Sequence, residues 1–550
     1  MNKNSVCAFA LCILGLSFQI VRGQTMGLMQ HDSLSYDKGY VLFSPIQYTS
    51  TYLIDKCGYL AHEWTSTYQP GQSAYLLPDG NLLREGNTNN VHFNAGGKGG
   101  IIEKLDWSSN ILWSYVISSD TDCAHHDFYP LPNGNILVIA WESKTDSEAI
   151  DMGRDPANVT GELWGEKIME LQPTGTSTAN IIWEWHAWDH MVQHFDNTKA
   201  NYAVVAAHPE LININFPAMG PSASAKDWLH ANSIAYIPEF DQIIISMHSI
   251  SEFWIIDHST TTEEAASHTG GTYGKGGDIL YRWGNPLAYG HGAISDKLLF
   301  GQHAVYQIPD GLPYAKDILL FNNGLNRSAG NYSTVERLTL PTTVSGDFDP
   351  TLPYLPSASS YTYTAPTPTD FYSPLISNAQ MLPNKNLLIC EGLKGHFFEI
   401  DSNENMVWDY INPVGISGPM TQGDTVTQNA CFRANFYENT YSGLTGHPLT
   451  SGVPVELDPI AYTCDLNLPS SILYEHKESP LHVSPNPCVD FLIIDDYKNQ
   501  NVSITDILGK YQTFAERAST GKLYLDISQL PAGIFLLHLN NQVKKFVVAR

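Results

Sequence analysis

The chain has 550 residues, of which 43% are hydrophobic, so it has enough apolar material for a large core and is not globally disordered. It carries 29 basic and 56 acidic residues, a formal net charge of −27. A surface this acidic repels phosphate backbones and anionic headgroups, so we expect no nucleic-acid partner and no binding to a membrane surface. The 42 glycines, 32 prolines and 11% aromatic residues favour short strands and tight turns over long helices.

The N-terminus is typical of a signal peptide. Lys3 precedes an apolar run, Val6 to Ile20, that is too short to span a bilayer. Val21 and Gly23 place small residues at −3 and −1 of a cleavage site, so we predict a signal peptide over 1–23 and export of the protein. The alternative is an N-terminal membrane anchor. The rest of the sequence contains no apolar run of 18 residues or more, so we expect no stable membrane insertion.

The cysteines favour an oxidising compartment. An even number, six, follow the signal peptide, which is consistent with one or more disulfides: Cys57, Cys123, Cys390, Cys431, Cys464 and Cys488. No two of them form a C-x-x-C pair, so we expect neither a zinc ribbon nor thioredoxin chemistry. The spacing does not determine which cysteines pair.

A unit of several strands recurs six times between residues 24 and 465. Its first half is a hydrophobic strand that ends in an acidic residue, then a turn and a strand that ends in Trp, as at Trp64, Trp113, Trp185, Trp283 and Trp408; the sixth copy, around Val335–Leu338, is degenerate. Its second half is a strand that leads into a hairpin of the Pro-x-Gly/Asn type. These strands open at Ser73, His126, His230, His303, Asn378 and Asn429, and the last blade must be completed from the other end of the chain.

Six such copies that close the N-terminus onto the C-terminus predict an all-β fold, a six-bladed β-propeller over 24–465. A two-sheet sandwich is the alternative, but it does not require the periodic Asp and Trp positions.

The last 70 residues have a different sequence pattern from the rest of the chain. After a linker over 466–480, residues 481–550 show short alternating segments that predict a small C-terminal β-sandwich. The Ser-Pro-Asn-Pro start at Ser484, the block from Asp526 to Leu537 and the basic Lys544–Val548 end resemble the C-terminal sorting domain of the type IX secretion system of Bacteroidetes. The resemblance implies contact with that secretion machinery and delivery to the cell surface or the medium. A carbohydrate-binding or adhesive module is the alternative.

Three histidines are predicted to meet on the propeller axis. The innermost strand of each blade starts at the central channel, and three of the six open with His126 (beside His125), His230 and His303. Arg327 lies on the hairpin that follows the His303 strand, and a guanidinium suits an oxyanion of the sulfate or phosphate type. The pattern therefore predicts an anion site inside a strongly acidic protein. The alternatives are structural histidines and a solvated turn arginine.

Around these residues the chain resembles the bacterial arylsulfotransferases over about residues 40–450. The matching segments are Asp-Trp-Leu-His-Ala-Asn-Ser (227–233), Gly-Gln-His-Ala (301–304) and Phe-Asn-Asn-Gly-x-Asn-Arg (321–327). The resemblance implies a six-bladed propeller that moves a sulfuryl group, without a nucleotide donor, from a phenolic sulfate donor to a phenolic acceptor through a sulfo-histidine. It implies that His230, His303 and Arg327 stabilise the sulfuryl oxygens and the leaving phenolate. Asn323, in the third segment, is expected to contact substrate.

One departure concerns the nucleophile. The family's nucleophilic histidine is expected to open the next innermost strand, where this sequence has Ser377 and Asn378. An amide cannot form a sulfo-imidazole. Three alternatives stay open: His396 serves instead, an axial histidine (His126, His230 or His303) takes the role, or catalysis is altered or lost. We expect Asn378 to contact substrate, and Tyr129 and Tyr306, close behind the axial histidines, to stack on the aryl group.

Other chemistries lack their motifs. The sequence has no P-loop, no C-x-P-x-R sulfatase segment after the signal peptide, no G-x-S-x-G and no H-E-x-x-H. Two alternatives to the exported sulfotransferase remain: a non-catalytic propeller that binds an anionic or aromatic ligand, and a metal site built from the clustered histidines. We expect no cofactor and no metal.

Overall fold

The structure is a computed structural model that describes residues 24–218, 226–349, 351–449, 451–462, 464, 483–495, 502–506, 510–519, 522–539 and 542–550. The predicted signal peptide (1–23) and linker (466–480) lie outside the described residues. The chain divides into two compact units, Met1–Asn467 and Leu468–Arg550. Among the residues described, no helix has both the length and the apolar character needed to cross a membrane.

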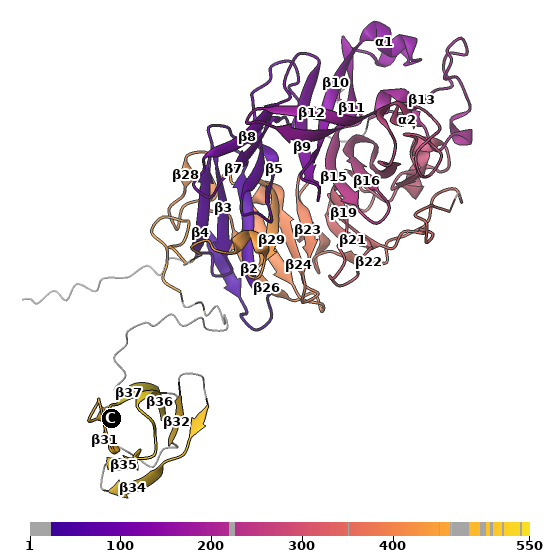
Figure 1. The fold of residues 1–550 in the computed structure, drawn as a ribbon. Helices are drawn as coiled ribbons and strands as arrows, with labels where there is room; N and C mark the ends of the chain where they lie inside the picture. Colours follow the sequence, from indigo (N-terminus) through magenta and orange to yellow (C-terminus); the bar gives the residue numbers. More distant parts are fainter. Residues whose placement is uncertain are drawn as a thin grey trace, which may run out of the picture. The chain divides into compact units, whose positions relative to one another are not determined.

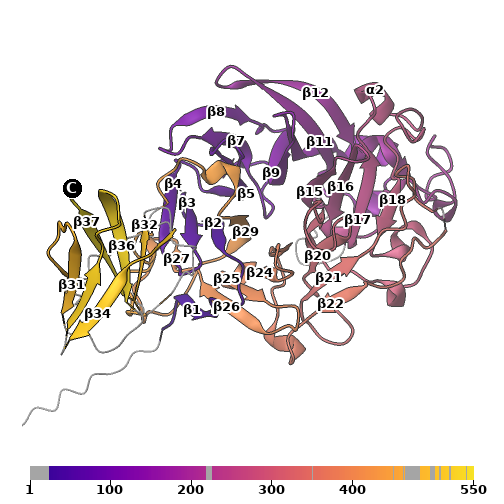
Figure 2. The same cartoon turned by 60° about the horizontal axis from the view of Figure 1, so that its bottom comes forward.

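The larger unit is a six-bladed β-propeller, and its blades follow one another around a ring (Figures 1 and 2). Each blade is an antiparallel sheet of four strands, with a fifth in the last. From the innermost strand outward, the first three blades are β29 (Cys431–Glu438), β2 (Gly39–Pro45), β3 (Ser50–Asp55) and β4 (Leu60–Thr65); β5 (Pro70–Leu76), β6 (Leu82–Asn87), β7 (Gly100–Leu105) and β8 (Ile111–Val116); and β9 (Asp122–Pro130), β10 (Ile136–Thr145), β11 (Glu162–Thr174) and β12 (Thr178–His186).

The other three blades follow in chain order. They are β15 (Ala231–Ile237), β16 (Gln242–Met247), β17 (Glu252–Asp257) and β18 (Tyr281–Trp283); β19 (His303–Gln307), β20 (Ile318–Asn322), β21 (Thr334–Leu338) and β22 (Tyr361–Tyr363); and β23 (Asn378–Met381), β24 (Leu387–Glu391), β25 (His396–Ile400), β26 (Met406–Ile411) and β1 (Gly27–His31). Two short α-helices, α1 (Asp146–Asp151) and α2 (Thr262–Ala265), lie outside the sheets. The predicted six-bladed architecture is confirmed.

Both ends of the propeller segment close the ring. β29, the innermost strand of the first blade, pairs with β2 so that Ala434 lies opposite Phe43. β1 extends the last blade, with Leu28 opposite Tyr410 on β26. The last repeat is therefore completed by the N-terminal part of the chain, as the sequence predicted.

The repeated tryptophans pack between blades. The outer strands carry Trp64, Trp185, Trp283 and Trp408, all buried. In the degenerate copy, β21 is the third strand and Tyr363 of β22 takes the place of the tryptophan. Because successive side chains of a strand alternate between its two faces, one bulky aromatic at a fixed position fills the space between neighbouring sheets.

Polar side chains of the innermost strands link neighbouring blades. The Asp127 carboxylate accepts hydrogen bonds from Ser73 Oγ (2.7 Å) on one side and from the Ile234 amide (3.0 Å) on the other. Asn378 accepts from the Ala434 amide and donates to the Ala434 carbonyl, each at 3.0 Å. Asn378 therefore links the last blade to β29.

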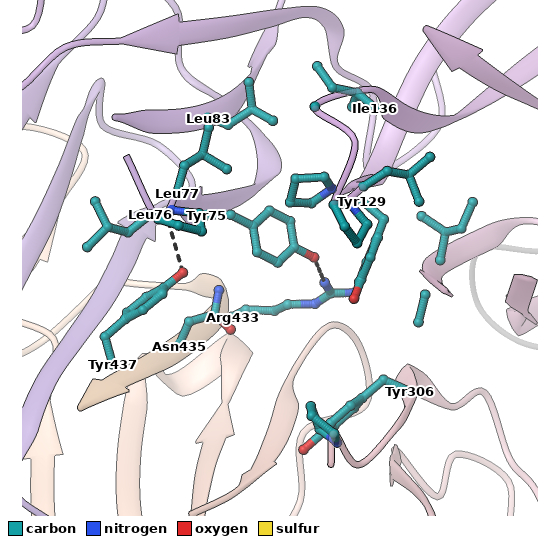
Figure 3. Close-up of a pocket in the computed structure, with 18 of the residues that line it drawn as sticks. Tyr75, Leu76, Leu77, Leu83, Tyr129, Ile136, Tyr306, Arg433, Asn435 and Tyr437 are labelled. Atoms are coloured by element: carbon teal, nitrogen blue, oxygen red, sulfur yellow. Dashed lines mark hydrogen bonds between the residues drawn. The ribbon is translucent and has the colours of Figure 1, made fainter. Parts of the chain in front are cut away.

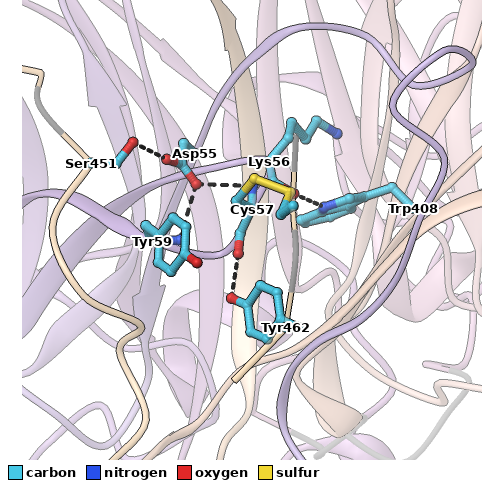
Figure 4. The surroundings of a disulfide bond; sticks show 8 residues. Asp55, Lys56, Cys57, Tyr59, Trp408, Ser451 and Tyr462 are labelled. Atoms are coloured by element: carbon cyan, nitrogen blue, oxygen red, sulfur yellow. Dashed lines mark hydrogen bonds between the residues drawn. A yellow bond between two sulfur atoms is a disulfide. The ribbon is translucent and has the colours of Figure 1, made fainter. Parts of the chain in front are cut away.

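A disulfide (Figure 4) and an ion pair fix the loop after β3. Cys57 is bonded to Cys464, 407 positions away in the sequence, and the Tyr462 hydroxyl donates to the Cys57 carbonyl. Lys56 Nζ lies 2.6 Å from Glu399 Oε2 on β25, and both side chains are fully buried. This buried ion pair joins the first blade to the last. Cys123, Cys390, Cys431 and Cys488 are free and buried.

The smaller unit is the predicted β-sandwich. One sheet consists of β30 (Val483–Ser484), β31 (Phe491–Asp495), β35 (Lys522–Asp526) and β34 (Ala515–Ser519); the other consists of β33 (Tyr511–Gln512), β32 (Val502–Asp506), β36 (Gly533–Leu539) and β37 (Gln542–Val548). Leu492, Leu525, Leu537 and Phe546 are buried in its own core. Alternation along β31, β35, β36 and β37 places these side chains inward.

Candidate active site

Four imidazole rings lie in a row at the propeller axis, where the innermost strands begin. The ring centroids of His126 and His230 are 4.6 Å apart, those of His230 and His248 are 5.3 Å apart, and those of His248 and His303 are 5.2 Å apart. All four side chains are buried. The structure thus brings together the three axial histidines that the sequence singled out, and it adds His248.

His248 could have been found from strand direction. It directly follows β16, which runs antiparallel to β15 with Met247 opposite Ala231, so the end of β16 lies beside the start of β15. The His248 amide donates to the His230 carbonyl at 3.1 Å. Both ring nitrogens of His248 are buried without a hydrogen-bond partner among the described residues. Burial first, and then the neighbouring histidines, hold its pKa well below the usual value, so its ring is neutral at pH 7.

Asp227 orients His230. Asp227 Oδ2 lies 2.5 Å from His230 Nδ1, and Asp227 Oδ1 accepts a hydrogen bond from Trp141 Nε1 at 3.1 Å. Although burial alone lowers the pKa of His230, the Asp227 carboxylate raises it above the ordinary value. A carboxylate on Nδ1 directs the other nitrogen, Nε2, away from Asp227 and favours an imidazolium.

The tautomer of His303 is fixed by Asn323. The amide nitrogen of Asn323 donates to the carbonyls of Ser373 and Ile376, each at 2.8 Å, so its oxygen faces His303 Nδ1, also at 2.8 Å. His303 Nδ1 therefore carries the proton. His303 Nε2 keeps a lone pair and accepts from the Ile376 amide at 3.2 Å. Burial lowers the pKa of His303 to about 3, so this ring is neutral at neutral pH.

His126 is the end of a chain of groups that can carry protons. Its Nδ1 lies 2.8 Å from His125 Nδ1, and His125 Nε2 lies 2.9 Å from Glu166 Oε2. The other Glu166 oxygen accepts from the Ala231 amide at 2.8 Å, at the start of β15. His125 stacks on Trp141 with ring centroids 3.9 Å apart. Burial lowers the pKa of both histidines, that of His125 to about 3.

Backbone strain marks the same place. His126 has φ 59° and His230 has φ 53°, both in the left-handed region. This conformation costs a residue other than glycine on the order of 1–2 kcal/mol, and such residues cluster at functional sites, where the surrounding structure holds them.

A cavity of about 640 Å³ opens beside these rings. It is lined by His248, Ser251, Ile294, Ser295, Lys297, Phe300, Gly301, Leu325, Asn326 and Ser328. Lys297 Nζ lies 4.9 Å from the centroid of the Phe300 ring. Burial lowers the pKa of Lys297 to about 8, so its ammonium is still largely charged at pH 7. The cavity thus combines a cation, an aromatic face and a neutral imidazole.

Arg327 lies next to this cavity but is turned to its own hairpin. Its Nη2 donates to Thr334 Oγ1 at 2.7 Å and its Nε donates to the Tyr332 carbonyl at 3.2 Å. The guanidinium lies 4.9 Å from the centroid of Phe300, which lines the cavity. The described contacts of Arg327 do not include an axial imidazole.

A different guanidinium occupies the axis. Phe432 of β29 lies near His126 and His303, and Arg433, the next residue, binds both oxygens of Asp127 at 3.0 and 2.7 Å. Arg433 also donates to the Tyr75 hydroxyl at 2.7 Å. This buried ion pair fills the axis one layer beyond the histidines. It could have been found from the repeat, because Arg433 lies on the last innermost strand, close to its start.

A larger cavity of about 870 Å³ lies beyond that ion pair (Figure 3). Tyr129, Tyr306, Asn378 and Arg433 are among its lining residues, and none of the axial histidines is. Tyr129 and Tyr306 lie three residues along their strands from His126 and His303, a step of roughly 10 Å. The two tyrosines, proposed from the sequence as substrate contacts, therefore lie further along the innermost strands than the axial histidines. Asn378, proposed with them, is the first residue of β23 and also lines this larger cavity.

His396 lies away from the axis. Its Nδ1 faces Glu391 Oε2 at 2.7 Å and its Nε2 faces Asp409 Oδ1 at 2.8 Å. Burial by itself lowers the pKa of His396, but the two carboxylates raise it to about 9. Both nitrogens therefore carry protons at neutral pH, and neither keeps the lone pair that a nucleophile needs.

The axial histidines do not form the tightest set of potential metal ligands. Within the described part of the chain, one group of three His, Cys, Asp or Glu ligand atoms lies within 4.8 Å of one another, and it consists of His190, His268 and Asp278.

Comparisons with known proteins place this geometry in context. The family model described as arylsulfotransferase (ASST) matches residues 44–441, and the secretion system C-terminal sorting domain matches residues 482–549. A search of curated proteins gave no match. The sorting domain supports export by the type IX system to the cell surface or beyond.

Solved structures with a similar fold are distant in sequence. A protein of unknown function from Bacteroides caccae is 12% identical, with 72% of this chain and 98% of that chain covered and a TM-score of 0.39. A catalytically inactive virginiamycin B lyase from Staphylococcus aureus, solved with quinupristin, is 12% identical, with coverage of 73% and 88% and a TM-score of 0.34. The β-propeller domain of Swd1 from Myceliophteria thermophila is 8% identical, with coverage of 72% and 88% and a TM-score of 0.33.

Proposed function

Because the chain belongs to the arylsulfotransferase family, we propose that it is an exported aryl-sulfate sulfotransferase that moves a sulfuryl group from a phenolic sulfate to a phenolic acceptor through a histidine on the propeller axis. The observation that carries this proposal is the difference in protonation between two axial histidines, His230 and His303, which lie on either side of His248. The pKa of His230 is raised and that of His303 is lowered. Two titratable groups of one site with pKa values pushed apart are the arrangement that acid–base and nucleophilic chemistry needs.

We assign the nucleophile to His303. Its proton is held on Nδ1 by Asn323, so Nε2 presents a lone pair without prior loss of a proton. The hydrogen bond from the Ile376 amide to this lone pair is 3.2 Å, at the long end of the normal range, and must break as the sulfuryl group approaches. His396 is unsuited because two carboxylates hold both of its nitrogens.

The transfer then takes two balanced steps. His303 Nε2 forms a bond to sulfur while the bond from sulfur to the phenolic oxygen breaks, and the departing phenolate takes a proton from His230 Nε2. In the second step the acceptor phenol gives its proton to His230 Nε2 and its oxygen attacks sulfur, which breaks the nitrogen–sulfur bond. Asp227 stabilises the charged form of His230 before the first step and after the second. No metal or nucleotide enters the scheme.

We assign substrate entry to the cavity of about 640 Å³ beside His248. Its cationic Lys297 suits the sulfate oxyanion and its Phe300 ring suits an aryl group. Lys297→Met is expected to lower kcat/KM for an aryl sulfate by about 100-fold, by analogy with the loss of one oxyanion donor. The larger cavity is separated from the histidines by the Asp127–Arg433 ion pair, so we do not place the reaction there.

The test is acceptor-dependent release of nitrophenol from p-nitrophenyl sulfate. The His303→Asn variant is expected to lose turnover by on the order of 10⁴-fold and to show no protein-bound sulfo group by mass spectrometry after exposure to donor alone. The control is His396→Asn, which removes a partly buried histidine away from the axis and is expected to keep turnover. A sulfo group that persists in His303→Asn and disappears in His396→Asn would reverse the assignment. Saturable sulfate-ester binding without turnover in the wild type would make the protein a binder.

We further propose that residues 1–23 direct the first export step as a signal peptide. N-terminal sequencing of the secreted protein tests this, and a mature chain that begins at Gln24 is the expected result.

A further inference from the structure

A second cluster of histidines lies at the outer strands, away from the axis. His190 is the last residue of the 3₁₀ turn η2 (Ala187–His190), which follows β12, the outermost strand of its blade. His268 and Asp278 lie in the segment between α2 and β18, the outermost strand of the next blade. Trp185 Nε1 of β12 donates to the Gly277 carbonyl at 2.7 Å, so this segment is packed against the preceding blade.

One carboxylate oxygen faces both imidazoles. Asp278 Oδ1 lies 2.8 Å from His190 Nδ1 and 2.8 Å from His268 Nδ1. The three ligand atoms lie within 4.8 Å of one another. His190 is fully buried and Asp278 nearly so, whereas the side chain of His268 is 60% exposed. Two fixed ligands and one adaptable ligand therefore meet at a point that solvent can reach.

The hydrogen bond on the far side of His190 determines its tautomer. His190 Nε2 lies 2.8 Å from the Ala265 carbonyl, which only accepts, so Nε2 carries a proton. In the neutral ring, Nδ1 then has a lone pair aimed at a carboxylate oxygen. Two lone pairs at 2.8 Å repel each other unless a cation lies between them, either a proton or a metal ion. The outer N–H bonded to a backbone carbonyl is also the arrangement that orients metal-binding histidines.

The ring cannot turn away from this contact. His190 stacks on Trp185 with an interplanar angle of 7° and ring centroids 5.7 Å apart. A Cβ at Gly277 would lie 2.7 Å from His190 Nε2, so the backbone there also packs closely on the ring. His190 is therefore held with Nδ1 toward Asp278.

We propose that His190, His268 and Asp278 bind one divalent transition-metal ion of the zinc class. Two imidazole nitrogens and a carboxylate oxygen form a donor set typical of zinc with an open fourth position, which water would fill on the exposed side of His268. A tetrahedral ion with bonds of about 2.0–2.1 Å needs ligand atoms roughly 3.3 Å apart. Binding therefore requires the Asp278 oxygen to move about 0.5 Å away from His190 Nδ1 and the exposed His268 ring to shift outward. The ion would cross-link the segment between α2 and β18 to the preceding blade.

The test uses the full-length protein after treatment with a chelator and dialysis. We expect native mass spectrometry to show one bound Zn²⁺ per chain, and Co²⁺ to give the visible absorption of a tetrahedral site. His268→Ala is expected to weaken Zn²⁺ binding by at least about 100-fold, since loss of a ligand costs no less than loss of an outer hydrogen-bond partner. His268 is exposed, so this variant is expected to fold.

Two controls sharpen the result. His208→Ala removes another partly exposed histidine, which pairs with Glu210, and is expected to bind Zn²⁺ as the wild type does. Zn²⁺ is expected to raise the Tm of the wild type and of His208→Ala but not that of His268→Ala. The proposal is wrong if the wild type binds no Zn²⁺, or if His268→Ala binds it unchanged; the cluster would then be two imidazoles that share protons with one carboxylate. Sulfotransferase activity is read separately and is expected to survive the chelator, so the two proposals fail independently.

Discussion

The carboxylate of Asp227 lies 2.5 Å from Nδ1 of His230, three residues later in the chain, and its other oxygen is fixed by the indole of Trp141. An acidic side chain so placed determines which nitrogen of the imidazole faces the axis. It also sets the pH at which that nitrogen gives up its proton.

Asp227→Asn is expected to lower kcat by about 10²–10⁴-fold, because an amide stabilises neither the tautomer nor the charged form of His230. The pKa of His230 would fall, so the activity that depends on its acid form would be lost at a lower pH than in the wild type. The measurement is a pH profile of p-nitrophenyl sulfate turnover. Asp241→Asn removes another carboxylate that faces a histidine Nδ1, at 2.7 Å from His258, but it is more exposed than Asp227 and lies off the axis, and the variant is expected to keep the wild-type profile. Equal losses in both variants would argue against a role for Asp227 in the reaction.

Arg433→Met is expected to destabilise the propeller by about 3–5 kcal/mol, because it leaves the buried Asp127 carboxylate without its cation. Urea unfolding followed by tryptophan fluorescence measures this, since all 12 tryptophans lie in the larger unit. Arg327→Met is the control, and loss of its bond to Thr334 is expected to cost about 1–2 kcal/mol. A smaller effect for Arg433 than for Arg327 would contradict the role assigned to the axial ion pair.

The propeller is expected to lose stability as the pH rises from about 6.5 to 9. The pKa values of His258 and His396 are each raised to about 9 by two carboxylates. A raised pKa means that the folded state holds its proton more tightly than the unfolded state, so the stabilisation is complete below the unfolded pKa and disappears as the pH passes the folded one. His396→Asn is expected to reduce this loss by about 1–3 kcal/mol, measured by urea unfolding at pH 6 and pH 9. If the stability of His396→Asn depended on pH as that of the wild type does, the prediction would be wrong.

Removing the Cys57–Cys464 bond is expected to cost about 2–5 kcal/mol. Cys57→Ser and Cys464→Ser should show equal losses in Tm, and reduction of the wild type should match them. Cys488→Ser lies in the smaller unit and is expected to leave the tryptophan-detected transition unchanged. If reduction still lowered the Tm of the Cys57→Ser variant, a disulfide other than Cys57–Cys464 would be responsible.

The fold could be predicted because each blade repeats the same physical requirement. A buried tryptophan on the outer strands and a Pro-Asp-Gly or Pro-Asn-Gly hairpin recur along the sequence, and both stay recognisable although insertions lengthen some of the repeats. Gly80, Gly134 and Gly311 each have a positive φ in such a hairpin. Closure by β29 also followed from the sequence, since the last repeat has no later strands to pair with. The pairing of Cys57 with Cys464 did not, because it depends on where the segment after β29 passes.

The axial site could be predicted only in part. His230 directly precedes β15, His303 begins β19 and His126 lies within β9 at the corresponding position of its repeat, so the repeat identified them. His248 was not predicted, because it follows β16, the second strand of its blade. Its position depends on the antiparallel pairing of β15 with β16 rather than on the repeat. Asn378 lies one residue beyond the axial layer: like Asp127, it links its strand to the next blade, and Ser377 is the residue before it. Contacts such as those of Arg327 and His396 depend on side-chain directions within hairpins, which residue spacing does not determine.

The pairing of β29 with β2 has a consequence for how the ring is assembled. Until residues 431–438 have been made, β2 presents one edge of unpaired N–H and C=O groups, although β3 and β4 already cover the other. An unpaired edge of this kind is a template for another chain. A polypeptide that stops short of residue 431 would therefore form an open ring in which one edge of β2 is unpaired. Such a chain is prone to associate with its own copies through that edge. Only β29, the last innermost strand, closes the propeller.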